Sequence, residues 1–428
     1  MKMDWVEPTL FDDEALPPVA PPKGRTAKRQ NLSQHGILPD RLIEELIEAE
    51  QITALNEIAG EQIQPASVDL RLGRWAYRVR GSFLPGKKRT LKSQLPELAL
   101  QKIDLRGGAI LEKNCVYLVE IQEHVDLPAD IAATANPKSS TGRLDVFVRL
   151  ITERTDVFDY VEPGYRGALY AEISPRSFAI RASEGSRLNQ LRFRKLGPKH
   201  EKYRMFGLSD KKLAELHARE PLVNGKAKIR MGLHLSVDLK SQGPVGYRAR
   251  RHTGIVDVDR VGEHRVEDFW EPVFAERSGR LVLDPLEFYI LASCESLCIP
   301  PQFAAEMVPI DPLMGEFRVH YAGFFDPGFG YGSGAGVGSR AVLEVRSYEV
   351  PFFLEHGQTV GRLIYERLVD SPSRLYGQGI GSNYQGQGLK LSKHFTTSEV
   401  SIPGADVKAK SKPPGKLRQK TKGTRPKV

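Results

Sequence analysis

The sequence predicts an all-β protein with a few short helices. Short runs of β-branched and aromatic residues recur along the chain between glycine- and proline-containing turns, a pattern typical of β-sandwiches and β-barrels. Landmark residues recur at a constant spacing of 172 positions, which indicates a tandem repeat of one β-rich domain. With 428 residues, the chain is long enough for two or three domains.

The first domain is expected to begin near Ile37. Residues 1–34 contain paired prolines and mixed charges, and we predict that they are disordered. Apolar residues at helical spacing follow Pro39, which predicts a helix over 39–52. Strands are predicted in five further segments: 63–73, 116–121, 147–152, 168–173 and 189–193.

The second domain repeats the landmarks of the first. Ser209, a good helix N-cap, stands where the first domain has Pro39. The motif Ser67-Val68-Asp69-Leu70 recurs as Ser236-Val237-Asp238-Leu239. We therefore predict domains over 35–200 and 201–402, joined around residues 195–206. The pairs at an offset of 172 are Tyr117 and Tyr289, Pro128 and Pro300, Glu172 and Glu344, Gly185 and Gly357, and Leu191 and Leu363.

Positive charge is concentrated at the C-terminus. The chain carries a net charge of +9, and residues 403–428 hold nine Lys or Arg against one acidic residue, Asp406, which gives +8 for this segment and leaves about +1 for the rest. We predict a disordered basic tail. A nucleic-acid-binding arm is the alternative for this segment, and the tail is the one place where we expect contact with nucleic acid.

The composition argues against several classes of protein. The three cysteines, Cys115, Cys294 and Cys298, make no disulfide framework and indicate a reducing compartment. No apolar run reaches the length of a membrane span, and the first residues do not resemble a signal peptide. We therefore expect a cytoplasmic protein that does not bind a membrane. The Pro-Cys-x-x-Cys signature of zinc deaminases is absent from the sequence.

A turn and hairpin in the second domain carry the first candidate for chemistry. Pro327-Gly328 is strong turn chemistry, and the strand that follows a glycine-rich insert places Glu344 among apolar residues. A carboxylate in that setting is costly unless it is paired or used. A solvent-facing glutamate on a half-exposed strand is the alternative.

The two copies differ most in one polar loop. The first copy has Asn136-Pro137-Lys138-Ser139-Ser140-Thr141-Gly142-Arg143, whereas the second has Ile310-Asp311-Pro312-Leu313-Met314-Gly315-Glu316. The second copy has lost two hydroxyls and an arginine that could bind an anion. Division of labour between the copies explains this loss better than the drift of a structural loop.

At these residues, the sequence resembles the dCTP deaminase family of the dUTPase-like fold, in a long form with two fused copies. The segment from Pro137 to Arg143 is similar to the family's Pro-Arg-Ser-Ser-x-x-Arg motif, and the segment 322–329 to its Ala-Gly-aromatic-Ile-Asp-Pro-Gly-Phe motif. Residues 384–388, with Ser392 soon after, resemble the tail that closes over bound nucleotide. The resemblance covers residues 37–395 and implies two tandem distorted β-barrel or jelly-roll domains.

The resemblance also implies a role for each site residue. Glu344 matches the catalytic glutamate and would act as general acid and base. Ser139 and Arg143 would position the water and stabilise the charge of the intermediate. The residues implied in nucleotide binding are Lys138, Ser139 and Ser140 for the triphosphate, Asp326 for the sugar 3′-hydroxyl, Ala322 for the base through its backbone, and Tyr384 and Gln387 for closure over the phosphates.

The implied reaction is metal-independent deamination of dCTP to dUTP and ammonia for dTTP synthesis. Mg²⁺ is expected only as the counter-ion of the triphosphate, and no zinc is expected. Because family sites lie between neighbouring domains, and only the first loop and the second hairpin keep every part, we expect one composite site per chain. The resemblance further implies a homo-oligomer and dTTP as a possible feedback inhibitor.

Two other functions stay open at this stage. The first is another enzyme of the same scaffold, a dUTP pyrophosphatase or a bifunctional enzyme that converts dCTP to dUMP. The second is a non-enzymatic nucleotide-binding regulator that uses its basic tail. The first copy keeps Glu172 but has Glu162 where the second has Asp326, so a weaker second site also stays open, and Asn383 replaces a lysine found in some family members.

Overall fold

The computed structural model describes residues 11–12, 35–197, 207–309, 317–320, 323–332, 338–347, 349–379 and 382–396. The predicted basic tail and most of the predicted disordered segment 1–34 lie outside these residues. Phe11–Asp12 is an exception, because it forms strand β1 and pairs in parallel with β16 (Gly207–Leu208). At these two positions the prediction of disorder is wrong.

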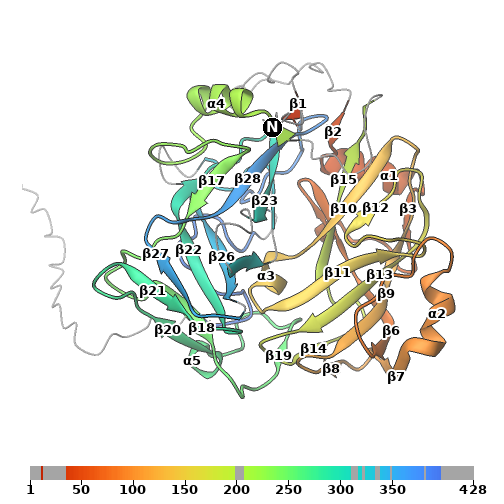
Figure 1. The fold of residues 1–428 in the computed structure, drawn as a ribbon. Coiled ribbons are helices and arrows are strands. Elements are labelled where there is room, and N and C mark those ends of the chain that lie inside the picture. Colours follow the sequence, from red (N-terminus) through yellow and green to blue (C-terminus); the bar gives the residue numbers. More distant parts are fainter. Residues whose placement is uncertain are drawn as a thin grey trace, which may run out of the picture. The chain divides into compact units, whose positions relative to one another are not determined.

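The described part of the chain is mainly β, as predicted, and its helices are short (Figure 1). Helix α1 follows Pro39 but ends at Glu48, because Glu50 adopts a left-handed conformation with φ 56° and the chain turns into β3. The predicted cap of α4 is confirmed, since Ser209 accepts a hydrogen bond from Lys212 N. The helices are α1 (Asp40–Glu48), α2 (Leu91–Leu98), α3 (Ser139–Gly142), α4 (Asp210–Arg219), α5 (Val266–Phe269) and the 3₁₀ helix η1 (Gly60–Gln62).

Two six-stranded sheets form the N-terminal half, residues 35–197. One has the order β12-β10-β15-β5-β4 with β2 on β15, and the other has the order β11-β13-β9-β6-β7 with β3 on β9. All five predicted strand segments lie in these sheets. The strands are β2 (Gly36–Ile37), β3 (Ile52–Ala54), β4 (Ile63–Gln64), β5 (Ser67–Leu70), β6 (Leu72–Val79), β7 (Ala99–Asp104), β8 (Ala109–Leu111), β9 (Val116–Asp126), β10 (Ile131–Pro137), β11 (Val146–Thr152), β12 (Tyr160–Val161), β13 (Arg166–Pro175), β14 (Ile180–Ala182) and β15 (Asn189–Lys195).

The C-terminal half, residues 207–396, has a four-stranded sheet β17-β28-β23-β25 and a five-stranded sheet β20-β18-β22-β26-β24. A separate pair joins β21 to β27, and β19 pairs with β14 of the N-terminal half. The strands are β17 (Leu233–Ser236), β18 (Gly246–Ala249), β19 (Val256–Asp257), β20 (Trp270–Val273), β21 (Arg280–Leu283), β22 (Phe288–Leu297), β23 (Phe303–Pro309), β24 (Phe317–His320), β25 (Phe324–Phe325), β26 (Ser339–Ser347), β27 (Phe352–Glu355) and β28 (Thr359–Arg367).

Equivalent strands of the two halves pair in the same register. The β10–β15 ladder runs from Ile131 opposite Lys195, and the β23–β28 ladder runs from Phe303 opposite Arg367, 172 positions later on both strands. The β9–β13 and β22–β26 ladders obey the same offset. One predicted match is wrong by four residues: β5 and β17 lie on equivalent strands, and their registers align Leu70 with Leu235 rather than with Leu239.

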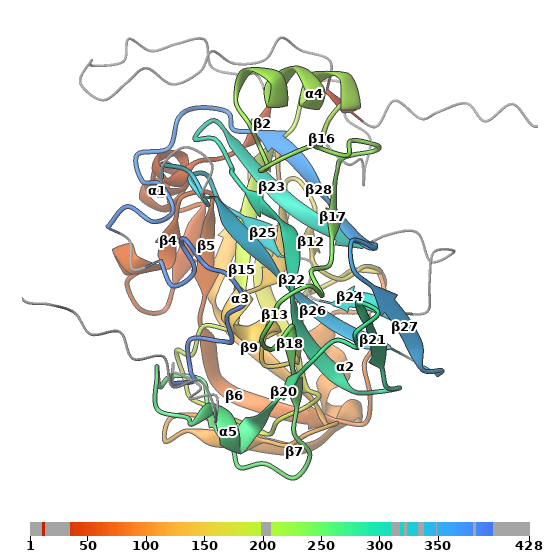
Figure 2. The same ribbon diagram turned by 90° about the vertical axis from the view of Figure 1, so that its left-hand side faces the viewer.

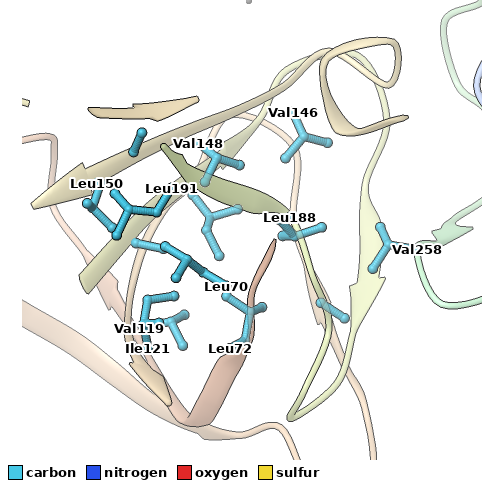
Figure 3. Close-up of a cluster of buried hydrophobic side chains, with 14 of the residues drawn as sticks. Leu70, Leu72, Val119, Ile121, Val146, Val148, Leu150, Leu188, Leu191 and Val258 are labelled. Atoms are coloured by element: carbon cyan, nitrogen blue, oxygen red, sulfur yellow. The ribbon is translucent and has the colours of Figure 1, made fainter. Parts of the chain in front are cut away.

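A buried apolar core fills the space between the two sheets of the N-terminal half (Figure 3). Leu70 and Leu191 come from one sheet and Val119 and Val148 from the other, as expected for strands that alternate inward and outward side chains. Val258, just after β19, belongs to the same core although it comes from the C-terminal half. The halves therefore share part of one hydrophobic interior.

Buried arginines of β15 join the halves, where β15 meets β23 and β28 (Figure 2). Arg194 makes a bidentate ion pair with Glu366, with N–O distances of 2.7 and 2.9 Å, and the two side chains are 8% and 6% exposed. Arg192 donates to Asp326 Oδ1 at 2.9 Å and to the carbonyl oxygen of Ala305 at 3.1 Å. Arg194 and Glu366 are themselves 172 positions apart, so equivalent positions meet at this contact.

Replacing Glu366 by Ala is expected to lower the free energy of unfolding by about 3–5 kcal/mol, because it removes the bidentate carboxylate from the buried Arg194 cation. The measurement is urea unfolding of the full chain. The control is Glu355→Ala, which breaks an ion pair with Arg280 whose side chains are 56% and 52% exposed and should cost less than about 1 kcal/mol. Equal losses in the two variants would contradict the structural role of the buried pair.

Candidate active site

A pocket that is partly open to solvent lies where the halves meet. Eight of the nine predicted site residues line it, and the ninth, Ala322, lies outside the described residues. The first half contributes the α3 turn and the second half contributes the hairpin and the C-terminal segment. The lining residues from the predicted set are Lys138, Ser139, Ser140, Arg143, Asp326, Glu344, Tyr384 and Gln387.

The α3 turn presents the polar groups of the first half. Thr141 N and Gly142 N both donate to the carbonyl oxygen of Lys138, which closes one helical turn and turns the side chains of Ser139 and Arg143 toward the pocket. The ammonium of Lys138 pairs with the buried carboxylate of Asp69 on β5. Because the pair leaves Lys138 part-exposed at the pocket wall, this end of the pocket offers a cation to an anionic ligand.

The Asp-Pro-Gly turn places Asp326 on the wall that the second half contributes. Phe329 N donates to the carbonyl oxygen of Asp326, and Gly328 takes a φ of 95°. A Cβ at Gly328 would lie 2.9 Å from the backbone nitrogen of Tyr376, so the turn requires glycine for space as well as for conformation. Asp326 is held by its ion pair with Arg192 of the first half, which fixes the carboxylate at the pocket edge.

Glu344 is a buried carboxyl group that lines the pocket. It lies in β26 between Ile290 of β22 and His320 of β24, and it is only 4% exposed. Burial raises its pKa to about 8, while the nearby Arg143 cation lowers it and Asp145 raises it further. The predicted solvent-facing alternative is therefore wrong, and the carboxyl group is protonated at neutral pH.

The C-terminal segment covers Arg143. Gln387 Oε1 and the carbonyl oxygen of Lys390 accept hydrogen bonds from Arg143 Nη1 at 3.0 and 2.9 Å, and the guanidinium carbon lies 3.9 Å from the centre of the Tyr384 ring. Gln387 is held in turn by Arg340, with which it exchanges two hydrogen bonds through the Arg340 backbone. Tyr384 and Gln387 are both buried, so the segment forms one wall of the pocket.

The equivalent glutamate of the first half is neutralised. Glu172 occupies the ladder position of Glu344, but Arg149 of β11 pairs with its Oε1 at 2.5 and 3.2 Å. The guanidinium of Arg149 also lies 3.5 Å from the ring centre of Phe158. Tyr170, the counterpart of Val342 in the pocket, packs beneath Leu91 of α2. The first half therefore differs from the second by a cation fixed on its glutamate and by a tyrosine in place of a valine.

Sequence reasoning missed several residues that line the pocket. Asp69 was noted only as part of a repeated motif, and Lys393 follows Ser392 in the C-terminal segment without having been assigned a role. Both flank Lys138, and burial together with the Lys138 cation lowers the pKa of Lys393. Their positions depend on the meeting of distant segments, which no local pattern signals. The other missed residues with polar side chains are Gln64, Gln190, Tyr376 and Ser382, whereas Asn383, named above for its replacement of a lysine, also lines the pocket.

Among the described residues, one group of potential metal ligands lies close together, namely Asp238, Cys294 and His356. It does not line the pocket, and its donors are already engaged: Asp238 pairs with Arg340, and His356 Nδ1 accepts from Leu239 N at 3.2 Å. The three cysteines are free. None of the helices in the described ranges is both long and apolar enough to traverse a bilayer.

The raised pKa of Glu344 predicts a pH dependence of stability. The folded state binds this proton up to about pH 8, whereas an unfolded glutamate releases it near 4.5, so the free energy of unfolding falls as pH rises through this window. Glu344→Gln cannot ionise and should therefore be more stable than the wild type by a few kcal/mol at pH 8, with little difference at pH 4.5, since one pKa unit corresponds to about 1.4 kcal/mol.

Urea unfolding at both pH values checks this expectation. The exposed Glu355→Gln variant serves as control and should follow the wild type at both. A Glu344→Gln variant whose difference from the wild type is the same at pH 4.5 and pH 8 would contradict it.

Comparison with known proteins agrees with this geometry. The family models for 2′-deoxycytidine 5′-triphosphate deaminase match residues 34–197 with the N-terminal domain and residues 209–395 with the C-terminal domain. A protein of Nanoarchaeum equitans named "dCTP deaminase, dUMP-forming" is 30% identical over 189 residues, which are 40% of this chain and 90% of that protein. A "dCTP deaminase" of Halorubrum lacusprofundi is 28% identical over 157 residues, 36% of this chain and 74% of that protein.

A solved structure is similar over a longer stretch. The crystal structure of 2′-deoxycytidine 5′-triphosphate deaminase from Agrobacterium tumefaciens superimposes with a TM-score of 0.74 and 51% sequence identity, and the match covers 78% of this chain and all of that one. The two family models match consecutive parts of the chain, and the solved relative shares 51% of its sequence with this chain. The chain belongs to the dCTP deaminase family.

Proposed function

We propose that the chain catalyses the hydrolytic deamination of dCTP to dUTP and ammonia, in one composite site built by both halves of a single chain. The observation that carries the proposal is the buried, protonated Glu344 facing a pocket whose other wall is the Ser139–Arg143 turn. A binding protein has no need of a buried carboxyl group whose pKa lies near the working pH, whereas acid–base catalysis does. The names of the relatives support the same reaction.

Glu344 supplies the proton transfers of the proposed reaction. Its carboxylic acid donates a proton to the pyrimidine ring, and the resulting carboxylate takes a proton from the water that attacks C4. That proton then passes to the departing amino group; the C4–N bond breaks, ammonia leaves, and the remaining proton of the C4 hydroxyl returns to Glu344 as the C4 carbonyl forms. Arg143 and Ser139 lie on the facing wall, where they orient the water and stabilise the negative charge of the intermediate.

The remaining residues bind the nucleotide in this proposal. Lys138, Ser139, Ser140 and Lys393 form the triphosphate end, where hydroxyls and cations suit phosphate oxygens. Asp326 accepts from the 3′-hydroxyl, Ala322 contacts the base through its backbone, and Tyr384 and Gln387 hold the C-terminal segment over the ligand. Mg²⁺ enters as counter-ion of the triphosphate, and the pocket lining in the described ranges includes neither histidine nor cysteine to bind zinc.

The fold and assembly complete the proposal. We assign both halves to the dUTPase-like fold as tandem copies, a reading that the shared ladder registers support. We further propose that the protein forms a homo-oligomer in the cytoplasm and that dTTP inhibits it. The basic tail is the part that would contact nucleic acid. Formation of dUMP is the second candidate, because relatives named dUMP-forming are as similar to this chain as those that are not.

The decisive assay incubates the full-length protein with dCTP and Mg²⁺ and separates the products by ion exchange, with parallel reactions on dUTP and with a chelator. Accumulation of dUTP and ammonia supports the proposed deaminase. Direct appearance of dUMP identifies the bifunctional enzyme, and cleavage of dUTP alone identifies a pyrophosphatase. Absence of any reaction with either nucleotide would refute an enzymatic function.

Glu344→Gln should lower kcat by about three orders of magnitude or more while dCTP binding persists, since the amide keeps the shape of the pocket but cannot shuttle protons. The matched control is Glu172→Gln, a buried glutamate at the same ladder position of the first half, which should keep kcat near the wild-type value. Steady-state kinetics and isothermal titration with dCTP test both. Equal loss in the two variants would contradict the assignment of one functional glutamate.

Lys393→Met should raise KM for dCTP about tenfold with little change in kcat, because the proposed contact is with phosphate oxygens remote from the reacting base. Lys240→Met, at an exposed position outside the pocket, serves as control. An unchanged KM in Lys393→Met would remove this residue from the triphosphate end.

A further inference from the structure

The end of the described C-terminal segment is fastened to the rest of the molecule. Backbone hydrogen bonds join Lys393 O to Gly262 N, His394 O to His264 N, and Thr396 N to His264 O. Phe395 packs among the aromatic rings of both halves, Phe178, Phe269 and Trp270. The segment thus ends in a fixed anchor formed by residues 392–396, directly after the part that covers Arg143.

Ser392 connects this anchor to the α3 turn. Its hydroxyl oxygen lies 2.7 Å from the carbonyl oxygen of Ser140 and 2.8 Å from Nδ1 of His394. Nε2 of His394 lies 2.9 Å from the carbonyl oxygen of Val258. Ser392 and His394 are each only 2% exposed, so bulk water cannot supply hydrogen bonds to these polar atoms. In the short helix α3, the carbonyl groups of Ser139, Thr141 and Gly142 accept backbone hydrogen bonds, and Ser392 supplies the donor for the carbonyl group of Ser140.

The three contacts require more protons than a neutral histidine provides. Both carbonyl oxygens can only accept, the hydroxyl carries one proton, and a neutral imidazole carries one more. The proton on Nε2 serves Val258, which leaves the Ser392 proton to serve either Ser140 or His394 Nδ1. Burial and the Lys393 cation lower the pKa of His394 to about 4, against the opposing effects of the Val258 carbonyl and Asp257, and His264 acts in the same direction as Lys393. The imidazole is therefore neutral at pH 7.

We propose that Ser392 and His394 are positioning residues of the site: Ser392 holds the Ser139–Arg143 turn through the Ser140 carbonyl group, and His394 competes for the same hydroxyl proton. This inference rests on the proposed function, because the turn it positions is the one assigned to water and phosphate binding. When the proton points to Ser140, the anchor and the turn are locked together. When it points to His394, this link between the anchor and the turn is lost, while the contacts of Arg143 with Gln387 and Lys390 remain.

Kinetics of full-length variants test the proposal. Ser392→Ala removes the donor and should lower kcat about tenfold with KM changed less than threefold, since the group acts on the geometry of the catalytic turn. Ser392→Thr keeps the hydroxyl and should stay within twofold of the wild type, as should Ser278→Ala at an exposed turn. His394→Gln keeps a donor for Val258 but removes the competing acceptor, so its kcat should equal or exceed that of the wild type.

Any other kinetic pattern overturns the proposal, in particular a Ser392→Ala variant within twofold of the wild type, or His394→Gln losing as much as Ser392→Ala. A spectroscopic measurement separates this result from the fate of the proposed function. Long-range ¹H–¹⁵N spectra, with His394 assigned by its absence in His394→Gln, should show the Nε2–H tautomer at pH 7 and a shifted Nδ1 resonance in Ser392→Ala.

An unchanged Nδ1 resonance in Ser392→Ala would refute the contact whether or not the enzyme is active. A wild-type protein that leaves dCTP untouched but shows the expected resonances would refute the proposed function alone.

Discussion

The buried charges of β15 are the constraint on which the rest of the site depends. Arg194 and Arg192 belong to the N-terminal half and form ion pairs with Glu366 and Asp326 of the other half. An arginine removed from water is strongly destabilising unless a carboxylate meets it with good geometry. The halves therefore have one favoured arrangement, and that arrangement brings the α3 turn opposite Glu344. Asp326 belongs to both systems, since it is an ion-pair partner and a wall of the pocket.

The two equivalent glutamates show how neighbours decide chemistry. Glu172 and Glu344 occupy the same position of the same ladder and are both buried. Arg149 on the adjacent strand neutralises Glu172, whereas Glu344 has His320 at the corresponding register position and Arg143 reaches it only from the other half. Glu344 therefore lines the pocket, whereas on the other hairpin Tyr170 packs in one apolar cluster with Leu91 of α2. Two halves with the same ladder registers can separate stability from chemistry in this way.

The sequence predicts what depends on short-range patterns and fails where distant segments meet. Alternating apolar residues between turns located the strands, and the polar motifs located the α3 turn, the Asp-Pro-Gly turn and Glu344. Register is different, because a repeated Ser-Val-Asp-Leu motif suggested a match that is four residues out. The bulge between Leu235 and Ser236, which only the partner strand reveals, lies at this point. Helix α2 was not predicted either, because Pro96 breaks the helical pattern of its sequence and its apolar side chains pack only against the adjacent sheet.

Strand β19 has a consequence for how the protein is made. Its residues pair with β14, and the neighbouring Val258 fills part of the interior of the N-terminal half. During synthesis from the N-terminus, that half leaves the ribosome with an unpaired edge on β14 and an incomplete core until residues 256–258 follow some sixty positions later. The N-terminal half is thus finished by the chain that comes after it, which makes completion of this half and docking of the C-terminal half a single cooperative event.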